Sequence, residues 1–591
     1  MWSNKEIAKL LRNVASSYAI KDDKKYRFQI IAYQKAADTI ENSSTEAKDL
    51  FKEGKLGLLP GIGTALKSHI EELLKTGDVK HFKEITKGIP KSLFILLDIP
   101  TFGPKRAYKL IKEFSLDNPD TVIKDLERLA TEGKIANLEG FGEKSQKDIL
   151  QIIAEFKKGK SKKNRMPLPY ASEIAEKMVN YLKKSVHIVK IFPLGSLRRK
   201  VSTIGDIDIA VATNKPEKVI KHFISYPYVE RVIEKGPTTA SILVSGGKQV
   251  DLMTQPPASF GSLLQHFTGS KDHNIHLREY ALKKGLSLSE YGIKKKLKDG
   301  TWKLENFETE EEFYKALGMD WISPELREDT GEIEGAISHN LPELVTISDI
   351  KGDLHTHSDY PLEPSHDLGR DSMENMLKKA IEFGYEYLGF SEHNPSVSTH
   401  NKEQIYSILS ARKKKIEQLN LSNKNIRVIN LLEVDISPNG NLALDDESIS
   451  LQDALIISVH SSFGMDKKEM TKRIIKGLSH PKAKILAHPT GRKINQRNGY
   501  ELDWEIIFDF CRRNNKALEI NAWPDRLDLP DITVRQAVEN KVKLVINTDS
   551  HALDQLELMR YGVDVARRGW AKESDILNTL GYNRIKEWLK Q

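Results

Sequence analysis

The stretch IGDIDIAVA (residues 204–212) decides the fold of the region around it. Acidic and apolar residues alternate there, which predicts a strand whose isoleucines, Ile207 and Ile209, face a core. Asp206 and Asp208 then share the opposite face and point into a cleft. Two carboxylates held this close repel each other unless a cation lies between them. Mg²⁺, bound through carboxylates and substrate phosphates, is the usual solution.

Two neighbouring segments strengthen this interpretation. Gly195 and Ser196 follow an apolar, strand-like segment (residues 189–193) and can offer backbone N–H groups and a hydroxyl to a phosphate tail. Asp251 adds a third acid from a separate apolar run, QVDLM (residues 249–253). An Asp-x-Asp pair alone would equally fit a solvated strand edge. Together the three segments predict the layout of two-metal phosphoryl transfer.

Length and composition bound the architecture. A chain of 591 residues predicts about three to five domains. The sequence lacks an apolar stretch of membrane-spanning length and a signal peptide, so we expect a cytoplasmic protein without a membrane partner. Cys511, the single cysteine, excludes an intramolecular disulfide and fits a reducing compartment.

The charge is unevenly distributed. The net charge is +8, yet residues 351–591 hold 35 basic and 35 acidic residues, so the whole excess lies in residues 1–350. A polyanion such as DNA is expected to bind there. The densest basic run, residues 157–165, also fits a soluble linker.

A short motif recurs in the first 160 residues, which read as helical. The copies are LPGIGTALK (59–67), IPTFGPKRA (99–107) and, more loosely, LEGFGEKS (138–145). A Gly-x-Gly turn at a helix N-terminus exposes backbone N–H groups, where a phosphate is welcome. One copy could be a plain connection between helices, but repetition in a basic region favours binding to the DNA backbone without sequence readout. The expected DNA-binding residues are Gly61, Gly63, Gly103, Lys105, Gly140 and Gly142.

From residue 350 onward the pattern is repeated strand and helix. Apolar strands are expected at residues 387–390, 428–432, 454–459, 485–487, 517–520 and 544–546. Six or more such units predict a parallel barrel, whose chemistry belongs at the C-terminal ends of its strands.

Possible metal ligands follow nearly every one of these strands. They are Asp353, His355, His357, His393, Glu433, His460, His488, Asp549 and His551. A lone histidine is usually an ordinary polar residue, but a set at six strand ends is not. Mixed imidazole and carboxylate ligands suit Zn, Mn or Fe, and this number suits two or three ions. Such a cluster activates water and clamps a phosphate ester for hydrolysis.

Both halves together resemble the bacterial and archaeal family X DNA polymerases that carry a C-terminal PHP (polymerase and histidinol phosphatase) domain. The resemblance implies a multidomain fold: an all-α helix-hairpin-helix region, an α/β nucleotidyltransferase palm with a thumb, and a (β/α) PHP barrel. The expected boundaries are 1–88 and 89–165 for two helical DNA-binding domains, 166–258 for the palm, 259–330 for the thumb, 331–349 for a linker and 350–591 for the PHP domain.

The resemblance also implies roles in the polymerase half. Asp206, Asp208 and Asp251 match the family's catalytic, metal-binding aspartates, which hold two Mg²⁺ ions. The nucleotide-binding residues implied are Gly195, Ser196, Arg199, Arg165, Phe267, Gly269, Asn274 and Arg278.

In the PHP half the implied ligands of Mn²⁺ or Zn²⁺ are His355, His357, His393, Glu433, His460, His488, Asp549 and His551. One more ligand is expected in the loop 358–370, which offers Asp359, His366 and Asp367. We favour Asp367. Because the set is retained, the resemblance implies an active phosphoesterase.

Three departures from the family pattern bear on activity. His266 stands where many relatives have Tyr, which puts sugar discrimination in doubt. His69 occupies the place of a Schiff-base lysine, while Lys67 and Lys35 are out of register, so deoxyribose-phosphate lyase activity is doubtful. Residues 236–239 lack a lysine that relatives often have.

Our hypothesis is a template-dependent, monomeric repair polymerase that acts on gapped or primed duplex DNA with dNTPs. Its PHP domain is expected to be a 3′→5′ exonuclease, with 3′-phosphatase or abasic-site cleavage as further activities. The rivals are a non-templated nucleotidyltransferase, a DNA-binding adaptor for the nuclease, and a small-molecule phosphatase.

Overall fold

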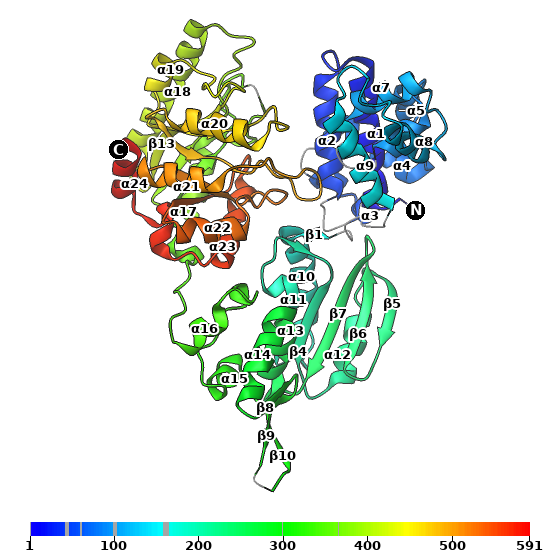
Figure 1. Cartoon of the computed structure of the whole chain (residues 1–591), viewed down its shortest axis with the longest axis vertical. Helices are drawn as coiled ribbons and strands as arrows, with labels where there is room; N and C mark the ends of the chain where they lie inside the picture. The colour runs from blue at the N-terminus through cyan, green and yellow to red at the C-terminus, as the bar shows by residue number, and fades with distance from the viewer. Residues whose placement is uncertain are drawn as a thin grey trace.

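The computed structural model describes residues 2–41, 46–59, 62–97, 103–157, 165–297, 299–364 and 366–591. Figure 1 shows a helical N-terminal region, a palm with its thumb, and a C-terminal barrel. The helical region has two hydrophobic cores of its own and the thumb has another, whereas the palm and barrel cores are continuous. None of the helices in the described ranges combines the length and the apolar run that a membrane-crossing segment requires.

The N-terminal region is entirely helical, as its sequence predicted. The helices are α1 (Asn4–Asp22), α2 (Arg27–Glu41), α3 (Ala47–Lys52), α4 (Thr64–Thr76), α5 (Lys80–Thr86), α6 (Lys91–Leu96), α7 (Pro104–Phe114), α8 (Val122–Thr131) and α9 (Glu143–Lys157). The first five helices supply one core and α6–α9 the other.

The palm is a mixed five-stranded sheet in the order β2-β4-β7-β6-β5. Its strands are β2 (Lys190–Pro193), β4 (Ile207–Ala212), β5 (Val229–Lys235), β6 (Thr239–Val244) and β7 (Lys248–Gln255), with β1 (Met166–Pro167) and β3 (Thr203–Ile204) as a separate pair. Helices α10 (Leu168–Leu182), α11 (Gly195–Arg198) and α12 (Pro216–Ile224) accompany it. Ile207 and Ile209 are fully buried, as the alternation predicted.

The thumb combines helices with a three-stranded sheet. It comprises α13 (Phe260–Thr268), α14 (Lys271–Lys283), β8 (Leu286–Ser289), β9 (Gly292–Lys296), β10 (Trp302–Glu305) and α15 (Glu310–Ala316). The stretch expected to be a linker begins with a further helix, α16 (Glu332–Ile337). Its Ile333 and Ala336 are buried in the thumb core, because their spacing places both on one face of the helix.

The C-terminal region is a parallel sheet of seven strands in sequence order. They are β11 (Gly352–Thr356), β12 (Tyr387–Phe390), β13 (Arg427–Asp435), β14 (Ala454–Ser458), β15 (Ala483–Leu486), β16 (Ala517–Asn521) and β17 (Lys543–Asn547). A bridge between Thr356 and Ser550 brings the first strand beside the last, so the barrel nearly closes. The surrounding helices are α17 (Met373–Glu382), α18 (Lys402–Ser422), α19 (Asp446–Ser450), α20 (Lys467–Leu478), α21 (Trp504–Arg513), α22 (Asp531–Glu539), α23 (Met559–Arg568) and α24 (Tyr582–Lys590).

Ionic contacts join the three regions. Lys48 of α3 pairs with Glu230 of the palm at 3.0 Å. Lys35 of α2 pairs with Asp367 of the barrel at 2.8 Å. From α23 of the barrel, Arg568 donates to the backbone oxygen of Arg199 at 2.7 Å. Arg199 of the palm is therefore held by a residue from the barrel.

Candidate functional sites

The palm brings the three predicted aspartates to one place. Asp208 on β4 lies directly opposite Asp251 on the parallel strand β7, and Asp206 immediately precedes β4. Asp251 accepts hydrogen bonds from Gln249 at 3.0 Å and from Ser241. Two adjacent parallel strands therefore present Asp208 and Asp251 on one face, which is the placement that the sequence predicted.

The electrostatics of these acids favours a bound cation. Burial, together with the charges of Asp206 and Asp251, raises the pKa of Asp208 to about 7. A carboxylate that resists ionisation because of two neighbouring acids is stabilised by a divalent cation, whose charge removes the repulsion. The donor set, oxygen only, fits Mg²⁺.

Gly195 and Ser196 lie beside this face. Gly195 has φ of 57° and begins α11, and a Cβ at this position would lie 2.5 Å from an Asp208 carboxylate oxygen. Only glycine therefore lets the loop approach the acid so closely. Ser196 follows in the first turn of α11.

The two predicted phosphate-binding arginines are already engaged with protein groups. Arg199 donates to Glu328 at 3.0 Å and to the backbone oxygen of Thr268. Arg165 donates to the Thr203 hydroxyl at 3.0 Å. These contacts fix both guanidinium groups close to the palm face.

The expected base-pair residues surround His266. Asn274 donates to the His266 backbone oxygen at 2.7 Å, and Arg278 lies 3.4 Å from His266 Nδ1. Burial and Arg278 lower the pKa of His266, which favours a neutral ring. Phe267 packs edge-on against the same ring, with centroids 4.8 Å apart, and a Cβ added at Gly269 would lie 3.0 Å from the Arg199 guanidinium.

Sequence reasoning missed one buried ionic cluster beside the loop. Arg198 of α11 and the fully buried Arg327 both bond Glu310, at 2.9 Å and 2.6 Å. Burial raises the Glu310 pKa, but the two arginines outweigh it and lower the pKa to about 2. The cluster ties the palm to the thumb. Arg198 lies 112 residues from Glu310 along the chain, whereas Arg327 lies 17 residues from it. No local pattern announces such a contact.

The hairpin glycines lie at helix starts. Gly63 and Gly103 are the N-cap residues of α4 and α7, and Gly142 immediately precedes α9, while Gly140 has φ of 83°. Added Cβ atoms at these four glycines would meet nothing within 4 Å, so a phosphate can approach the backbone. The remaining two predicted residues differ: Gly61 lies outside the described residues, and Lys105 pairs with Asp23 at 2.6 Å.

His69, which occupies the place of the family's Schiff-base lysine, lies in an aromatic cluster. His69 bonds the Tyr33 hydroxyl at 2.9 Å and stacks on His81 with centroids 4.7 Å apart. Lys35 points instead toward the barrel, where it pairs with Asp367. Imidazole and phenol groups offer no amine for a Schiff base.

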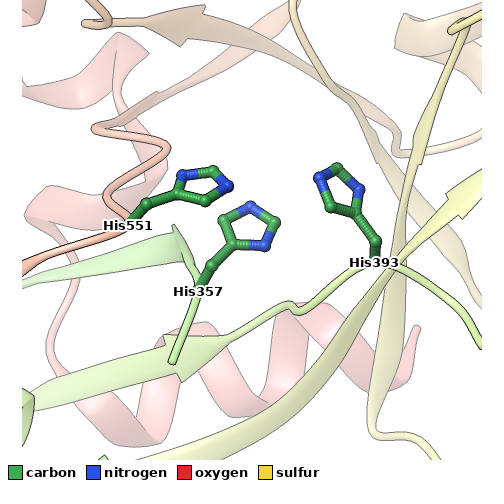
Figure 2. A group of neighbouring side chains, drawn as sticks. All are labelled: His357, His393 and His551. Carbon is green, nitrogen blue, oxygen red and sulfur yellow. The ribbon is translucent and has the colours of Figure 1, made fainter. Parts of the chain in front are cut away.

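In the barrel the predicted ligands converge at the strand ends. Four groups have ligand atoms within 4.8 Å of one another: His355-His357-Asp549, Glu433-His460-His488, His357-His393-His551 and His366-His393-His460. Figure 2 shows the rings of the third group approaching a common space from different segments of the barrel.

Glu433 lies at the centre of the cluster. One carboxylate oxygen is 3.2 Å from His355 Nε2 and 2.9 Å from His393 Nδ1, and the other is 3.0 Å from His488 Nε2. Burial raises the pKa of Glu433, but His393, His355 and His460 hold it well below its ordinary value. A carboxylate with imidazoles at both oxygens has the position of a bridging ligand.

The loop 358–370 contributes at the open side. Asp367 has one carboxylate oxygen 3.9 Å from His393 Nε2 and the other 3.9 Å from His551 Nε2. His366 also reaches the cluster, in the group with His393 and His460, and lies 3.3 Å from Asp435, whereas Asp359 is exposed. A Cβ at Gly369 would lie 2.1 Å from the backbone oxygen of His357, so glycine lets the loop return to the strand end.

Orphaned polar atoms show that this cluster fits metal ions. Several buried atoms have no hydrogen-bond partner among the described residues: His355 Nε2, both ring nitrogens of His357, His393 Nδ1, Glu433 Oε2, His488 Nδ1 and His551 Nε2. Leaving so many buried polar atoms unpaired is costly, and metal coordination satisfies them.

Two further carboxylates, missed by the sequence analysis, touch the ligands from behind. Asp435, at the end of β13, lies 2.6 Å from His460 Nδ1. Glu519 on β16 lies 2.7 Å from His355 Nδ1. The sequence shows Glu519 within one predicted barrel strand and Asp435 shortly after another, which could have marked them as candidates. The ligand that each acid touches depends on how the neighbouring strands are arranged.

The chain resembles known proteins throughout its length. Residues 2–79 match a helix-hairpin-helix domain, residues 263–328 match the DNA polymerase beta thumb, and residues 353–522 match the PHP domain. Over 589 residues, 99% of both chains, it is 34% identical to the DNA polymerase/3′-5′ exonuclease PolX of Bacillus subtilis (strain 168). The chain belongs to the PHP-bearing family X DNA polymerases.

More distant family X relatives cover only part of the chain. DNA polymerase lambda of Rattus norvegicus is 23% identical over 353 residues, which are 55% of this chain and 56% of the relative. DNA polymerase lambda of Arabidopsis thaliana is 24% identical over 359 residues, 55% of this chain and 62% of the relative. Polymerase and PHP domains of this family are generally metal-dependent.

Proposed function

We propose that the protein is a template-dependent DNA repair polymerase that fills short gaps and carries a metal-dependent 3′→5′ exonuclease in its PHP domain. The register that places Asp208 opposite Asp251, beside the Gly195 loop, carries the polymerase assignment. The full-length similarity to PolX supports both activities on one chain.

In the polymerase site Asp206 and Asp208 would hold two Mg²⁺ ions, with Asp251 as a ligand of one of them. When bound, the ions supply charge neutralisation at the triphosphate and at the attacking hydroxyl. The primer 3′-oxygen bonds to the α-phosphorus of the dNTP as the bond to the pyrophosphate oxygen breaks. Asp251 would receive the hydroxyl proton.

The phosphates of the leaving group meet the protein at the loop that begins α11. Ser196 and the backbone N–H groups would bind them together with Arg199 and Arg165. Asn274 and Arg278, which converge on His266, would contact the nascent base pair. Phe267 and Gly269 would pack on the sugar.

The helical region would hold gapped or primed duplex DNA through its hairpins. Gly63, Gly103, Gly140 and Gly142 have open space at the backbone, and phosphate contacts of this kind fix position without reading sequence. Gly61 and Lys105 belong to the same proposed surface. The excess positive charge of residues 1–350 supports it. We expect a monomer that acts in the cytoplasm.

The PHP site would hold two or three ions, Mn²⁺ or Zn²⁺. Glu433, whose two carboxylate oxygens face different histidines, would be one of the residues that hold them. The proposed ligands are His355, His357, Asp367, His393, Glu433, His460, His488, Asp549 and His551. When bound, the ions supply an activated water for hydrolysis of the terminal phosphodiester.

One gel assay tests both halves. A 5′-labelled primer on a one-nucleotide gapped duplex is incubated with Mg²⁺ or Mn²⁺, with and without dNTPs. Templated extension with dNTPs and shortening without them are expected. Asp206→Ala should lose extension and keep DNA binding, and His488→Ala should lose shortening and keep extension.

The control variant is His222→Ala, whose ring stacks on Tyr181 in the palm away from both sites. It should retain both activities. Substantial extension by Asp206→Ala would refute the polymerase site. Untemplated addition would favour a non-templated transferase, and loss of both activities in His488→Ala would refute independent sites.

A further inference from the structure

Strand β16 supplies none of the proposed metal ligands, yet one of its side chains lies directly beneath them. All five residues of the strand are buried, and Glu519 is 0% exposed. Burying a carboxylate is costly unless hydrogen bonds and opposite charge compensate it. The partners of Glu519 therefore reveal why a carboxylate occupies this position.

Four donors surround the two oxygens of Glu519. Oε1 lies 2.7 Å from His355 Nδ1 and 2.9 Å from Asn547 Nδ2. Oε2 accepts the backbone N–H of His488 at 2.7 Å and the Asn521 side-chain amide at 3.0 Å. Each oxygen accepts two hydrogen bonds, so the acceptor-only carboxylate matches its surroundings completely.

The bond to His355 sets the direction of the ring. Because Nδ1 donates to Glu519, the other nitrogen, Nε2, carries the free lone pair. That nitrogen lies 3.2 Å from Glu433 and 3.5 Å from Asp549, and within the described part of the chain it has no hydrogen-bond partner. It faces the first candidate ion position, which His355 forms with His357 and Asp549.

The bond to His488 acts through the backbone. His488 has φ of 29°, a left-handed conformation that a histidine rarely adopts. Glu519 accepts its N–H, and the ring of His488 then lies 3.0 Å from Glu433 Oε1. This ring belongs to the group with Glu433 and His460, at the neighbouring ion position.

We propose that Glu519 is a positioning residue that fixes His355 and His488, so that one carboxylate sets the metal affinity of two neighbouring ion positions. This inference rests on the proposed metal-dependent nuclease. Asn521 extends the network, because its amide also reaches Asp549 at 3.2 Å. Hydrogen-bonded carboxylates behind metal-bound histidines orient the ring and raise its basicity.

Glu519→Gln is the sharpest variant because it keeps the volume of the side chain. Whichever way the amide is oriented, its NH₂ group faces two donors that the carboxylate oxygen had satisfied. Glu519→Asp is the second variant. It keeps the charge but is one methylene shorter, so it cannot reach all four donors in the same way.

A control must separate lost stability from lost metal binding. Asn578 is fully buried against the same barrel, where it bonds the backbone of Gly352 and Ile546 and none of the proposed ligands. Asn578→Ala should destabilise the barrel without touching the ligands. All variants are made in the full-length chain.

The measurement is Mn²⁺ binding by isothermal titration, with exonuclease and templated extension assayed in parallel. Glu519→Gln should bind Mn²⁺ about 10- to 100-fold more weakly than wild type. Glu519→Asp should show a smaller loss. Exonuclease activity should fall but recover partly at high Mn²⁺, and extension should remain unchanged. Asn578→Ala should bind Mn²⁺ like wild type.

The outcomes distinguish this proposal from the function on which it rests. Wild-type protein that neither binds Mn²⁺ nor shortens primers would refute the nuclease itself. A nuclease-active wild type with Glu519→Gln at wild-type Mn²⁺ affinity would overturn only the role of Glu519. Should Glu519→Gln fail to fold, Glu519→Asp decides in the same way. An equal loss in Asn578→Ala would mean that stability, not positioning, explains the effect, and would also overturn it.

Discussion

Replacing Asp208 by Asn should stabilise the palm when divalent ions are chelated. Burial and two neighbouring acids raise the pKa of this carboxyl from 3.8 to about 7. The folded state therefore binds the proton more tightly than the unfolded state, and ionisation at neutral pH opposes folding. The difference corresponds to a penalty of about 4 kcal/mol above pH 7, which falls as the pH drops and vanishes below about pH 4. Asn removes the charge and with it the penalty.

Hydrogen exchange can resolve this effect within one domain. Amides of β4 and β7 in Asp208→Asn, with EDTA at about pH 8, should exchange at least about 10-fold more slowly than in wild type, with about 1,000-fold as the upper limit. Added Mg²⁺ should reverse the order, because only wild type retains the full ligand set.

Glu234→Gln is the matched control, since Glu234 is an exposed acid on β5 and loses the same charge. It should leave the exchange unchanged. Protection in Asp208→Asn that equals or falls below wild type in EDTA would refute the argument that the acids repel one another.

Three other expectations concern buried groups. Glu310→Gln should destabilise the thumb and palm by about 3–5 kcal/mol in denaturant unfolding, because Arg327 loses its anionic partner. In wild type, the stabilisation from ionised Glu310 is present above its unfolded-state pKa of 4.5. It should be lost as the pH falls toward the folded-state pKa of about 2. Arg568→Ala should raise the dNTP KM by about 10-fold while exonuclease stays within about twofold, because Arg568 supports the Arg199 backbone from the barrel; equal loss of both activities would contradict this. Burial raises the pKa of the Cys511 thiol to about 12, so iodoacetamide should label it only after unfolding, and rapid labelling of native protein would show that the thiol is accessible.

Local patterns determined the elements and most of the proposed ligand positions. Alternation around Asp206 and Asp208 predicted the palm strand, and the apolar runs after residue 350 predicted a parallel barrel, because side-chain periodicity follows directly from backbone geometry. Strand ends meet at one edge of a parallel sheet, so histidines placed there could be expected to converge.

The partners of these residues were decided only by tertiary structure. Glu519 was visible as an acid inside an apolar strand, but its bonds to His355 and His488 depend on the order of the barrel strands. Likewise, Arg198 meets Glu310, and Arg568 meets Arg199, across long separations in sequence. A sequence specifies what each strand or helix presents, whereas the groups that compensate a buried charge are chosen by how those elements pack.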